Sequence, residues 1–286
     1  SFVIMMFNIP IIGGTTAHAV GAVFIAIVLG PWAACISISA ALLIQALVFG
    51  DGGILAFGVN CFNMAVVMPF VGYAVYRLIA GKSRELSKRT ALGTLIGSYI
   101  GINSAALFAA VEFGIQPIFF KTAEGLPLYC PYPLPVTIPA MLFSHGLFAG
   151  PLEAVVTVSA LALVSKYAPD MFNDVYEKSS SNVKTRKVLI GIFSGLVLLT
   201  PLGLLASGTA WGEWNPTELK SMLGYIPQGI AKAAGKWSGI IPDYSLAGIP
   251  ENLVYIFSAV IGIVLIFVIM LVTSKIVLHF KKADRD

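Results

Sequence analysis

Long apolar stretches separated by short polar segments dominate this sequence. Seven of them stand out, and most contain enough residues to cross a hydrocarbon layer of about 30 Å at 1.5 Å per residue. They cover Thr15–Leu29, Trp32–Phe49, Asn60–Ile79, Thr90–Val111, Ile138–Val164, Val188–Ala206 and Leu253–Val277. Because a helix satisfies its own backbone hydrogen bonds in lipid, each stretch predicts a transmembrane helix. We therefore expect an all-α fold, a polytopic membrane bundle of about seven helices.

The composition agrees with a membrane protein. The chain is 57% hydrophobic and 11% charged, whereas soluble domains carry about 25% charged residues. No basic patch is interleaved with stacking aromatics, so membrane lipid rather than nucleic acid is the expected partner. Cys35, Cys61 and Cys130 lack the spacing of a thiolate metal site. No resident cofactor is expected.

Lys and Arg residues fall almost entirely on one side of the predicted bundle. The loop after the third stretch, the segment after the fifth and the C-terminal tail hold fourteen of the 18. The opposite side keeps only Lys121, Lys220, Lys232 and Lys236. By the positive-inside rule, the basic loops and the C-terminus are expected in the cytoplasm of a multi-pass plasma-membrane protein.

The chain divides at a polar, Ser-rich segment. We expect residues 1–165 to form a five-helix membrane domain and residues 166–187 a cytoplasmic linker. Residues 188–286 are expected to form a two-helix hairpin with a long external loop. In the fifth stretch, Gly150-Pro151 predicts a kink, because proline cannot continue the hydrogen-bond ladder.

Polar residues gather at the predicted outer ends of the helices. GGTTAHAVGA places His18 one turn into the first helix, and His145 lies near the outer end of the fifth. Asp51 lies in a facing outer loop, with Asn60 and Asn63 at the end of the third helix. Imidazole is a common ligand of nickel, cobalt and zinc, and carboxylates or amides orient it. The pattern suggests an outer metal site, although packing, a turn at Asp51 and a helix cap at Asn60 are the ordinary alternatives.

Two further features have open interpretations. Glu153 lies within the fifth stretch, where an ionisable group is costly. Both a hydrogen bond between helices and a role in substrate handling would explain it. The stripe Gly93, Gly97 and Gly101 allows close helix approach, either inside the chain or from a separate membrane subunit.

Enzyme motifs are missing from the sequence. There is no HExxH and no GxSxG. We expect a transport component rather than an enzyme, with any ATP hydrolysis carried out by a separate chain.

Several motifs together resemble a known family. NIPIIGGTTAHAVGA, LGPWAA, FGDGGILAFGVNCFNM, MPFVGY and IPAMLFSHGLFAGPLEAVVT follow in the order found in the CbiM/NikM family. These proteins are the substrate-binding membrane components of energy-coupling-factor transporters for cobalt and nickel. The resemblance covers about residues 1–165. The tail, with VLLTPLGLLASGTAWGEW and PDYSLAGIPE, looks like the small two-helix accessory component, although PDYSL departs from that family's PDGLE motif.

The resemblance implies a mechanism and a site. Metal is captured from outside, and a scaffold transmembrane subunit with a pair of cytoplasmic ATPases drives its release inside. His18 matches a family metal ligand. The family site also uses the amino-terminal amine and an opening Met-His pair. This sequence opens at Ser1 within an apolar run, so we expect that an upstream segment has been omitted.

We therefore expect a recognition component for divalent cobalt or nickel in an ATP-driven importer. The sequence does not choose between the two ions, although a nitrogen-rich planar site suits nickel. One rival is a substrate-binding component for an organic vitamin, which needs a larger aromatic pocket. The other is a membrane enzyme or assembly factor without transport.

Overall fold

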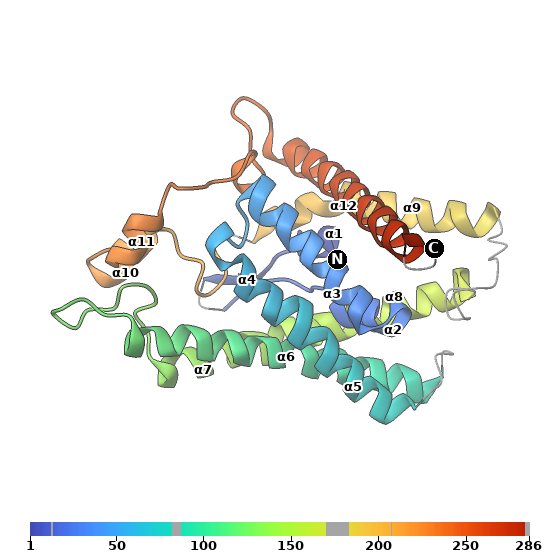
Figure 1. Cartoon of the computed structure of the whole chain (residues 1–286), viewed down its shortest axis with the longest axis horizontal. Helices are drawn as coiled ribbons and strands as arrows, with labels where there is room; N and C mark the ends of the chain where they lie inside the picture. The colour runs from blue at the N-terminus through green and yellow to red at the C-terminus, as the bar shows by residue number, and fades with distance from the viewer. Residues whose placement is uncertain (13, 82–86, 170–182, 207, 284–286) are drawn as a thin grey trace.

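The computed structural model describes residues 1–12, 14–81, 87–169, 183–206 and 208–283. The chain forms an elongated bundle with most long helices roughly along its long axis (Figure 1). In the list that follows, η marks short 3-10 or π-helical segments. In chain order the elements are α1 Phe2–Met5, β1 Ile9–Ile11, β2 Thr15–Ala17, α2 Ala22–Leu29, α3 Pro31–Ile44, η1 Gln45–Phe49, η2 Ile54–Ala56, α4 Phe57–Asn60, η3 Cys61–Val67, α5 Met68–Ala80, α6 Lys88–Phe119, α7 Leu134–Ser144, η4 His145–Ala149, α8 Gly150–Tyr167, α9 Val183–Leu199, η6 Thr200–Leu205, α10 Pro216–Leu223, α11 Gln228–Ala233, η7 Pro242–Tyr244 and α12 Glu251–Ala283.

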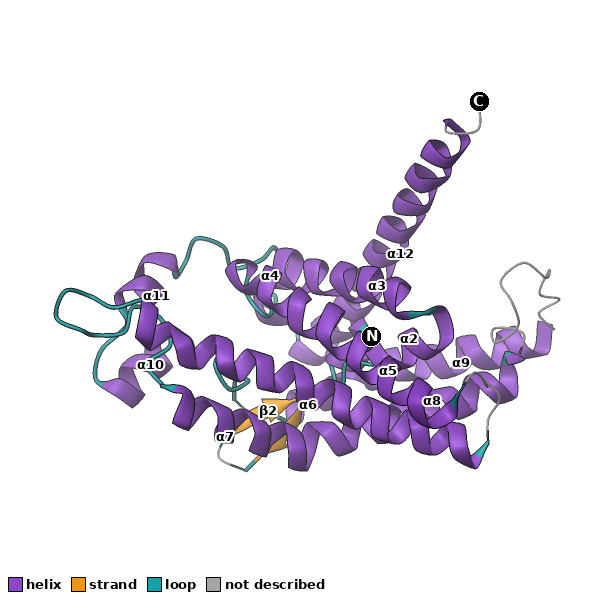
Figure 2. Cartoon of the chain, turned by 60° about the horizontal axis from the view of Figure 1, so that its bottom comes forward, coloured by secondary structure: helices purple, strands orange, loops and turns teal. Residues whose placement is uncertain are grey.

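Six continuous helical segments in the described part of the chain are long and apolar enough to cross a membrane. They are Pro31–Phe49, Ile54–Ala80, Lys88–Phe119, Leu134–Tyr167, Lys187–Leu205 and Glu251–Ile276. Their outer surfaces carry exposed apolar side chains, such as Phe267 and Leu271 on α12. In Figure 2 the C-terminal half of α12 projects away from the other helices. The polytopic helical class predicted from the sequence is confirmed.

The first predicted helix, Thr15–Leu29, is wrong. Thr15–Ala17 is instead strand β2, which pairs antiparallel with β1 in the register Ile9↔Ala17. Helix α2 begins only at Ala22 and has eight residues, so it is about 12 Å long and too short to span a bilayer. Gly21, at φ 74°, is in the left-handed conformation that separates the two elements.

The glycine stripe on α6 packs inside the chain. A Cβ built on Gly97 would lie 2.6 Å from the carbonyl oxygen of Gly72, and one on Gly101 would lie 2.8 Å from that of Met68. Both neighbours belong to α5, so the two helix backbones touch along this seam. The docking of a separate subunit on this stripe is therefore excluded, because α5 already occupies it.

The predicted kink at Gly150-Pro151 takes the form of a π-helical turn. Residues His145–Ala149 form η4 immediately before it, and η3 likewise precedes Met68-Pro69. Proline has no N–H and its ring clashes with the carbonyl four residues earlier, so the preceding turn widens. Each π turn lies within a long span, which continues beyond it.

The C-terminal part of the chain shares a core with the N-terminal part. Val197 of α9 and Tyr255 of α12 belong to the same buried cluster as Phe2 and Phe49. The hydroxyl of Tyr255 donates to the carbonyl of Met6 at 3.0 Å. Helix α12 also runs beside α3. Most of the predicted linker lies outside the described residues, because 170–182 are not described.

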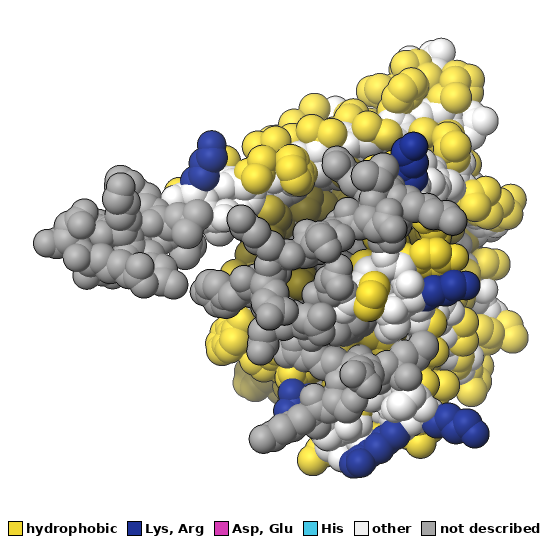
Figure 3. All heavy atoms as spheres, turned by 90° about the vertical axis from the view of Figure 1, so that its right-hand side faces the viewer, with side chains coloured by type: hydrophobic (Ala, Val, Ile, Leu, Met, Phe, Trp, Pro, Cys, Tyr) yellow, Lys and Arg dark blue, Asp and Glu magenta, His cyan; other side chains and the backbone are white. Residues whose placement is uncertain are grey.

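One end of the molecule is basic. Figure 3 shows Lys and Arg side chains at the end where the C-terminus lies, and no Asp, Glu or His side chain is visible among its described atoms. The positions of basic residues at the ends of several helices agree with this view. Lys88 and Arg89 begin α6, Lys166 is in the last turn of α8, and Lys187 is near the start of α9.

Candidate metal centre

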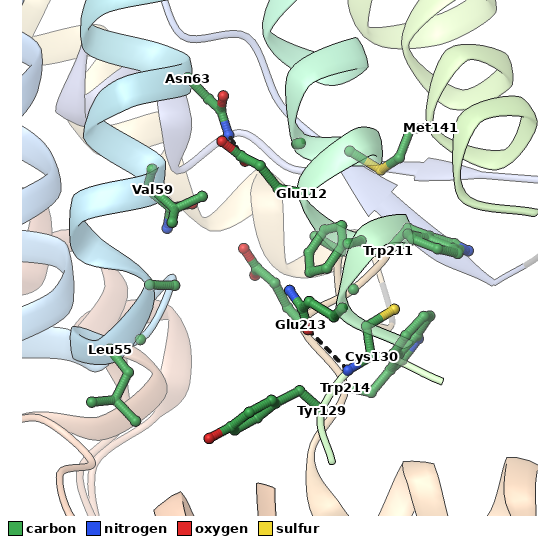
Figure 4. A pocket seen from close by; sticks show the side chains of 18 of the residues that line it. Leu55, Val59, Asn63, Glu112, Tyr129, Cys130, Met141, Trp211, Glu213 and Trp214 are labelled. Carbon is green, nitrogen blue, oxygen red and sulfur yellow. Dashed lines mark hydrogen bonds between the residues drawn. The ribbon is translucent and has the colours of Figure 1, made fainter. Parts of the chain in front are cut away.

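A cavity of about 700 Å³ lies among the ends of several spans and segments of the C-terminal part of the chain. Its walls come from β2, from α4 with η3, from the second half of α6, and from the turn between α7 and η4. The segments Ala210–Pro216 and Ala233–Trp237 close it from the C-terminal part of the chain. In Figure 4, Leu55, Val59, Met141 and Trp211 contribute apolar and aromatic surface, while Glu112 and Glu213 point into the space.

His18 lines this cavity, but it is not in a helix as the sequence predicted. It follows β2 in irregular backbone and is half-buried. Its Nδ1 lies 3.2 Å from the carbonyl oxygen of Ala19. A carbonyl only accepts, so this contact favours the tautomer with hydrogen on Nδ1 and a free lone pair on Nε2. Burial lowers the pKa of His18, while the charge of Asp51 acts in the opposite direction.

The backbone on both sides of His18 is fixed by distant residues. Downstream, the buried carboxylate of Glu153 accepts from the backbone N–H of Val20 at 2.7 Å and of Gly21 at 3.0 Å. Upstream, the backbone N–H of Thr16 donates to the carbonyl of Thr209 at 3.3 Å. Glu153 also accepts from the Thr157 hydroxyl at 3.2 Å. Glu153 therefore holds the backbone that follows His18, and the carbonyl of Thr209 holds the backbone that precedes it.

His145 lines the same cavity as His18. It begins η4, and its Nδ1 lies 2.9 Å from the carbonyl oxygen of Met141. Its Nε2 is therefore the nitrogen left for another partner. The two imidazoles are close enough to interact electrostatically. Two imidazoles beside one cavity offer nitrogen atoms of the kind that nickel and cobalt accept as ligands.

Asp51 does not line the cavity, although it lies near it. Its carboxylate accepts from the amide of Gln45 at 3.0 Å and from the hydroxyl of Tyr244. Tyr244 also stacks on Phe49, with ring centroids 4.5 Å apart. Burial raises the pKa of Tyr244 well above its usual value, and the charge of Asp51 adds to this, so the hydroxyl stays a donor. Asp51 thus joins the two parts of the chain.

The contact between the C-terminal part of the chain and the end of η1 also satisfies backbone carbonyls that would otherwise be free. The backbone N–H groups of Ile240 and Ile241 donate to Val48 at 2.7 and 2.8 Å. The indole of Trp237 donates to the carbonyl of Ala46 at 3.2 Å. Carbonyls at a helix C-terminus lack partners within the helix. The segment Trp237–Ile241 supplies the missing donors here, and in this way it holds the loop that carries Asp51.

The two predicted asparagines have different roles. The side-chain amide of Asn60 donates to the carbonyl of Gly52 at 3.2 Å, which fixes the glycine loop. Asn63 points into the cavity from η3 and donates to Glu112 Oε2 at 2.6 Å. Both asparagines line the cavity, but Asn60 holds the adjacent glycine loop, whereas Asn63 holds the carboxylate of Glu112.

Three residues that contribute to this region were not candidates from the sequence. Glu112 and Glu213 face the cavity, and Tyr244 holds Asp51. Burial, with the charge of Asp51 second, raises the pKa of Glu213 to about 7. Glu213 lies between Trp211 and Trp214 in the sequence, and no local pattern there predicts that it faces a cavity. No local signal pairs Tyr244 with a residue so far away in the chain.

Within the described residues, no group of three His, Cys, Asp or Glu side chains could hold a metal ion. The structure brings His18 and His145 to one cavity, with Asp51 nearby and Glu153 behind the His18 segment. The cavity wall therefore carries two imidazole side chains together with carboxylate and amide oxygens.

Comparisons with known proteins agree with the residue pattern. A family described as the cobalt uptake substrate-specific transmembrane region (CbiM) matches residues 1–171. The PDGLE domain matches residues 185–279, despite the departure of the motif at PDYSL. The accessory-like character predicted for the tail is therefore confirmed.

Several relatives match nearly the whole chain, and two of them share about half of its residues. The probable fused nickel transport protein LarMN of Lactiplantibacillus plantarum is 50% identical over 95% of this chain and 81% of its own length. The fused nickel transport protein NikMN of Rhodobacter capsulatus is 47% identical over 93% of this chain and 81% of its own length. The crystal structure of a truncated transition metal transporter, 56% identical, superposes with a TM-score of 0.54 over 58% of this chain and 76% of that one.

The two rival interpretations fail on these matches, because the relatives are named for metal transport and none of the three is an enzyme or a vitamin carrier. The histidine pair lies within the part that matches the cobalt uptake region, and the part that matches the PDGLE domain supplies some of the cavity wall. The chain belongs to the CbiM family of metal transport proteins, with a PDGLE domain fused at its C-terminal end.

Proposed function

We propose that this protein is the substrate-recognising membrane component of an ATP-driven importer of the energy-coupling-factor type, and that nickel is its principal cargo. Divalent metal enters the cavity from outside and binds His18. A scaffold transmembrane subunit and a pair of cytoplasmic ATPases, all separate chains, supply the energy for release inside. Cobalt is the second candidate cargo.

The single observation that carries the proposal is the placement of His18. Its segment is held by Glu153 on one side and by Thr209 on the other, and its imidazole lines the cavity. Ligands held by hydrogen bonds to the surrounding protein bind metal better than mobile ones. His145 stands nearby as a further nitrogen donor.

The charge distribution supports an orientation. The basic end in Figure 3 is the end where the C-terminus lies. Helices α10 and α11, which contribute to the cavity wall, lie at the other end in Figure 1. The positive-inside rule then assigns the basic end to the cytoplasm and the cavity to the outside of the cell membrane.

The fused domain arrangement supports nickel. The three relatives that match more than 90% of the chain in these comparisons are all named as fused nickel transport proteins. Nickel and cobalt accept similar nitrogen ligands, so ligand type alone does not separate them. Uptake of radioactive nickel in the presence of excess cobalt measures the preference directly.

His18→Ala tests the site. In cells that express the protein with its partner subunits, we expect nickel uptake to fall at least tenfold, to the level of cells without the transporter, because a direct ligand is lost. The amount of protein in the membrane should not change. His279→Ala, in the C-terminal tail, is the matched histidine control. Uptake at the unmodified level of both metals in the His18 variant contradicts the assignment.

A further inference from the structure

We propose that Asn63 and Glu112 form a second cation site in the cavity wall, where the incoming divalent metal binds before it reaches His18. The proposal rests on the proposed function, since the cation is the transported metal. It assigns an oxygen-donor site, distinct from the imidazole nitrogens of His18 and His145.

The geometry of the pair is unusual for a membrane span. Asn63 is 4% exposed and comes from η3, a π-helical turn within the span Ile54–Ala80. Glu112 is half-buried and comes from α6. The amide of Asn63 donates to Glu112 Oε2 at 2.6 Å. Because a carboxylate only accepts, this contact also fixes which end of the amide faces Glu112.

The amide oxygen of Asn63 is the second observation. It is buried and has no hydrogen-bond partner among the described residues. A buried acceptor without a donor costs about 1–3 kcal/mol, so such atoms are rare unless a ligand or water meets them. The hydrogen bond engages one oxygen of Glu112 and leaves Oε1 available. The pair therefore has two oxygen atoms without a protein donor among the described residues, one charged and one neutral.

These donors suit a hydrated divalent cation. Carboxylate and amide oxygens bind such ions while several waters remain attached. Glu213 points into the same cavity from the C-terminal part of the chain (Figure 4) and adds to its acidic character. Lys236, also on the wall, is exposed. A low-dielectric cavity with carboxylates concentrates cations.

The difference in donor type gives the order in which the two sites would bind the metal. Asn63 and Glu112 line the same cavity as His18 and His145. Nickel and cobalt bind imidazole nitrogen more strongly than neutral or singly charged oxygen donors in water-rich surroundings. An oxygen site at the wall and a nitrogen site at His18 therefore form a gradient of affinity that draws the metal inward.

Glu112→Gln is the decisive variant. Glutamine keeps an acceptor for Asn63 and removes only the charge, so the fold should survive. Nickel uptake is measured against external nickel concentration in cells that express the full transporter. We expect the half-saturating concentration to rise about tenfold, in the range that metal sites show when one supporting group is lost. The maximal rate should stay within about twofold. His18→Ala should remove uptake at every concentration.

Two more variants and a control complete the experiment. Asn63→Ala removes the unpartnered oxygen and should also raise the half-saturating concentration, while Glu112→Asp should restore much of the affinity. Glu124→Gln neutralises an exposed carboxylate of the outer loop and should change nothing. An unchanged half-saturating concentration in Glu112→Gln, with normal uptake by the unmodified protein, overturns the site and leaves a buried water as the partner of Asn63.

A binding measurement separates this proposal from the proposed function. Calorimetric titration of the purified His18→Ala protein with nickel should show a weak residual site, and His18→Ala combined with Glu112→Gln should lose it. Equal residual binding in both proteins contradicts the second site alone. Absence of nickel and cobalt uptake by the unmodified transporter would instead contradict the proposed function.

Discussion

Glu153 and Glu112 are both glutamates within membrane-spanning helices, yet their surroundings are opposite. Glu153 is fully buried, and its carboxylate accepts from Val20, Gly21 and Thr157. Glu112 is half-buried at the cavity wall and accepts from Asn63 alone. A carboxylate whose oxygens are occupied by donors stabilises the fold, whereas one with a free oxygen beside a cavity is open to a ligand.

Two other carboxylates extend this comparison. Asp51 accepts from Gln45 and Tyr244, whereas for Glu213 the described residues supply no side-chain hydrogen bond of the kind that Glu153 makes. Glu153 and Asp51 each accept from two or more protein donors and do not line the cavity. Glu112 and Glu213 have one such donor or none among the described residues, and both line the cavity. The number of donors, rather than depth along the helix, separates the carboxylates held inside the protein from those that face the cavity.

Replacement of Glu153 should have the largest effect on stability. Glu153→Ala leaves the backbone N–H groups of Val20 and Gly21 buried without an acceptor. At about 1–3 kcal/mol for each such group, we expect a loss of roughly 2–6 kcal/mol and little folded protein in the membrane. The thermal unfolding midpoint of the purified protein in detergent measures this.

Glu112→Ala is the matched control for that variant. It removes the acceptor of one side-chain amide, that of Asn63, rather than of two backbone N–H groups, so the midpoint should fall less. Equal losses in the two variants would break the comparison between the two glutamates.

Loss of the Tyr244 hydroxyl should have a smaller effect. Tyr244→Phe keeps the stacking on Phe49 and removes one hydrogen bond to a carboxylate, worth about 1.5–3 kcal/mol. We expect a midpoint several degrees lower and reduced nickel uptake, because the loop that carries Asp51 is less firmly held. Tyr225→Phe, on the same external segment, should leave both unchanged. No change in Tyr244→Phe would mean that the stacking alone holds the junction.

Replacement of Glu213 should have the smallest effect, and it should appear as a change in the way stability depends on pH. Its folded pKa of about 7 lies above the ordinary value of 4.5. The folded protein therefore keeps a proton that the unfolded chain has lost, so stability falls as the pH rises from about 4.5 to about 7. In Glu213→Gln this fall should be absent.

The unfolding midpoint measured across that pH range tests this, with Glu251→Gln, exposed at the start of α12, as the control. Asp51→Asn should weaken the fall, since the charge of Asp51 contributes to the raised pKa of Glu213. A profile that Glu213→Gln does not alter would show that other groups cause the pH dependence.

Some residues of the cavity could be predicted from the sequence, whereas the contacts of others could not. His18, His145 and Asn63 were identified as candidates because polar side chains at the ends of apolar stretches are conspicuous, and all three line the cavity. Glu153 was recognised as unusual, but its two possible roles could not be separated. Its partners Val20 and Gly21 lie 133 and 132 residues away, and they are backbone groups that carry no sequence signal.

The sequence by itself determined the membrane class and the six spans that the structure retains, because in lipid each apolar segment must satisfy its own backbone locally. Only the tertiary structure decided that Thr15–Leu29 breaks into a strand and a short helix, since Glu153 and Thr209 compete for the backbone groups that a helix would use. It also decided that Tyr244 meets Asp51 across 193 residues. Contacts of this range depend on how helices pack, and local patterns do not encode them.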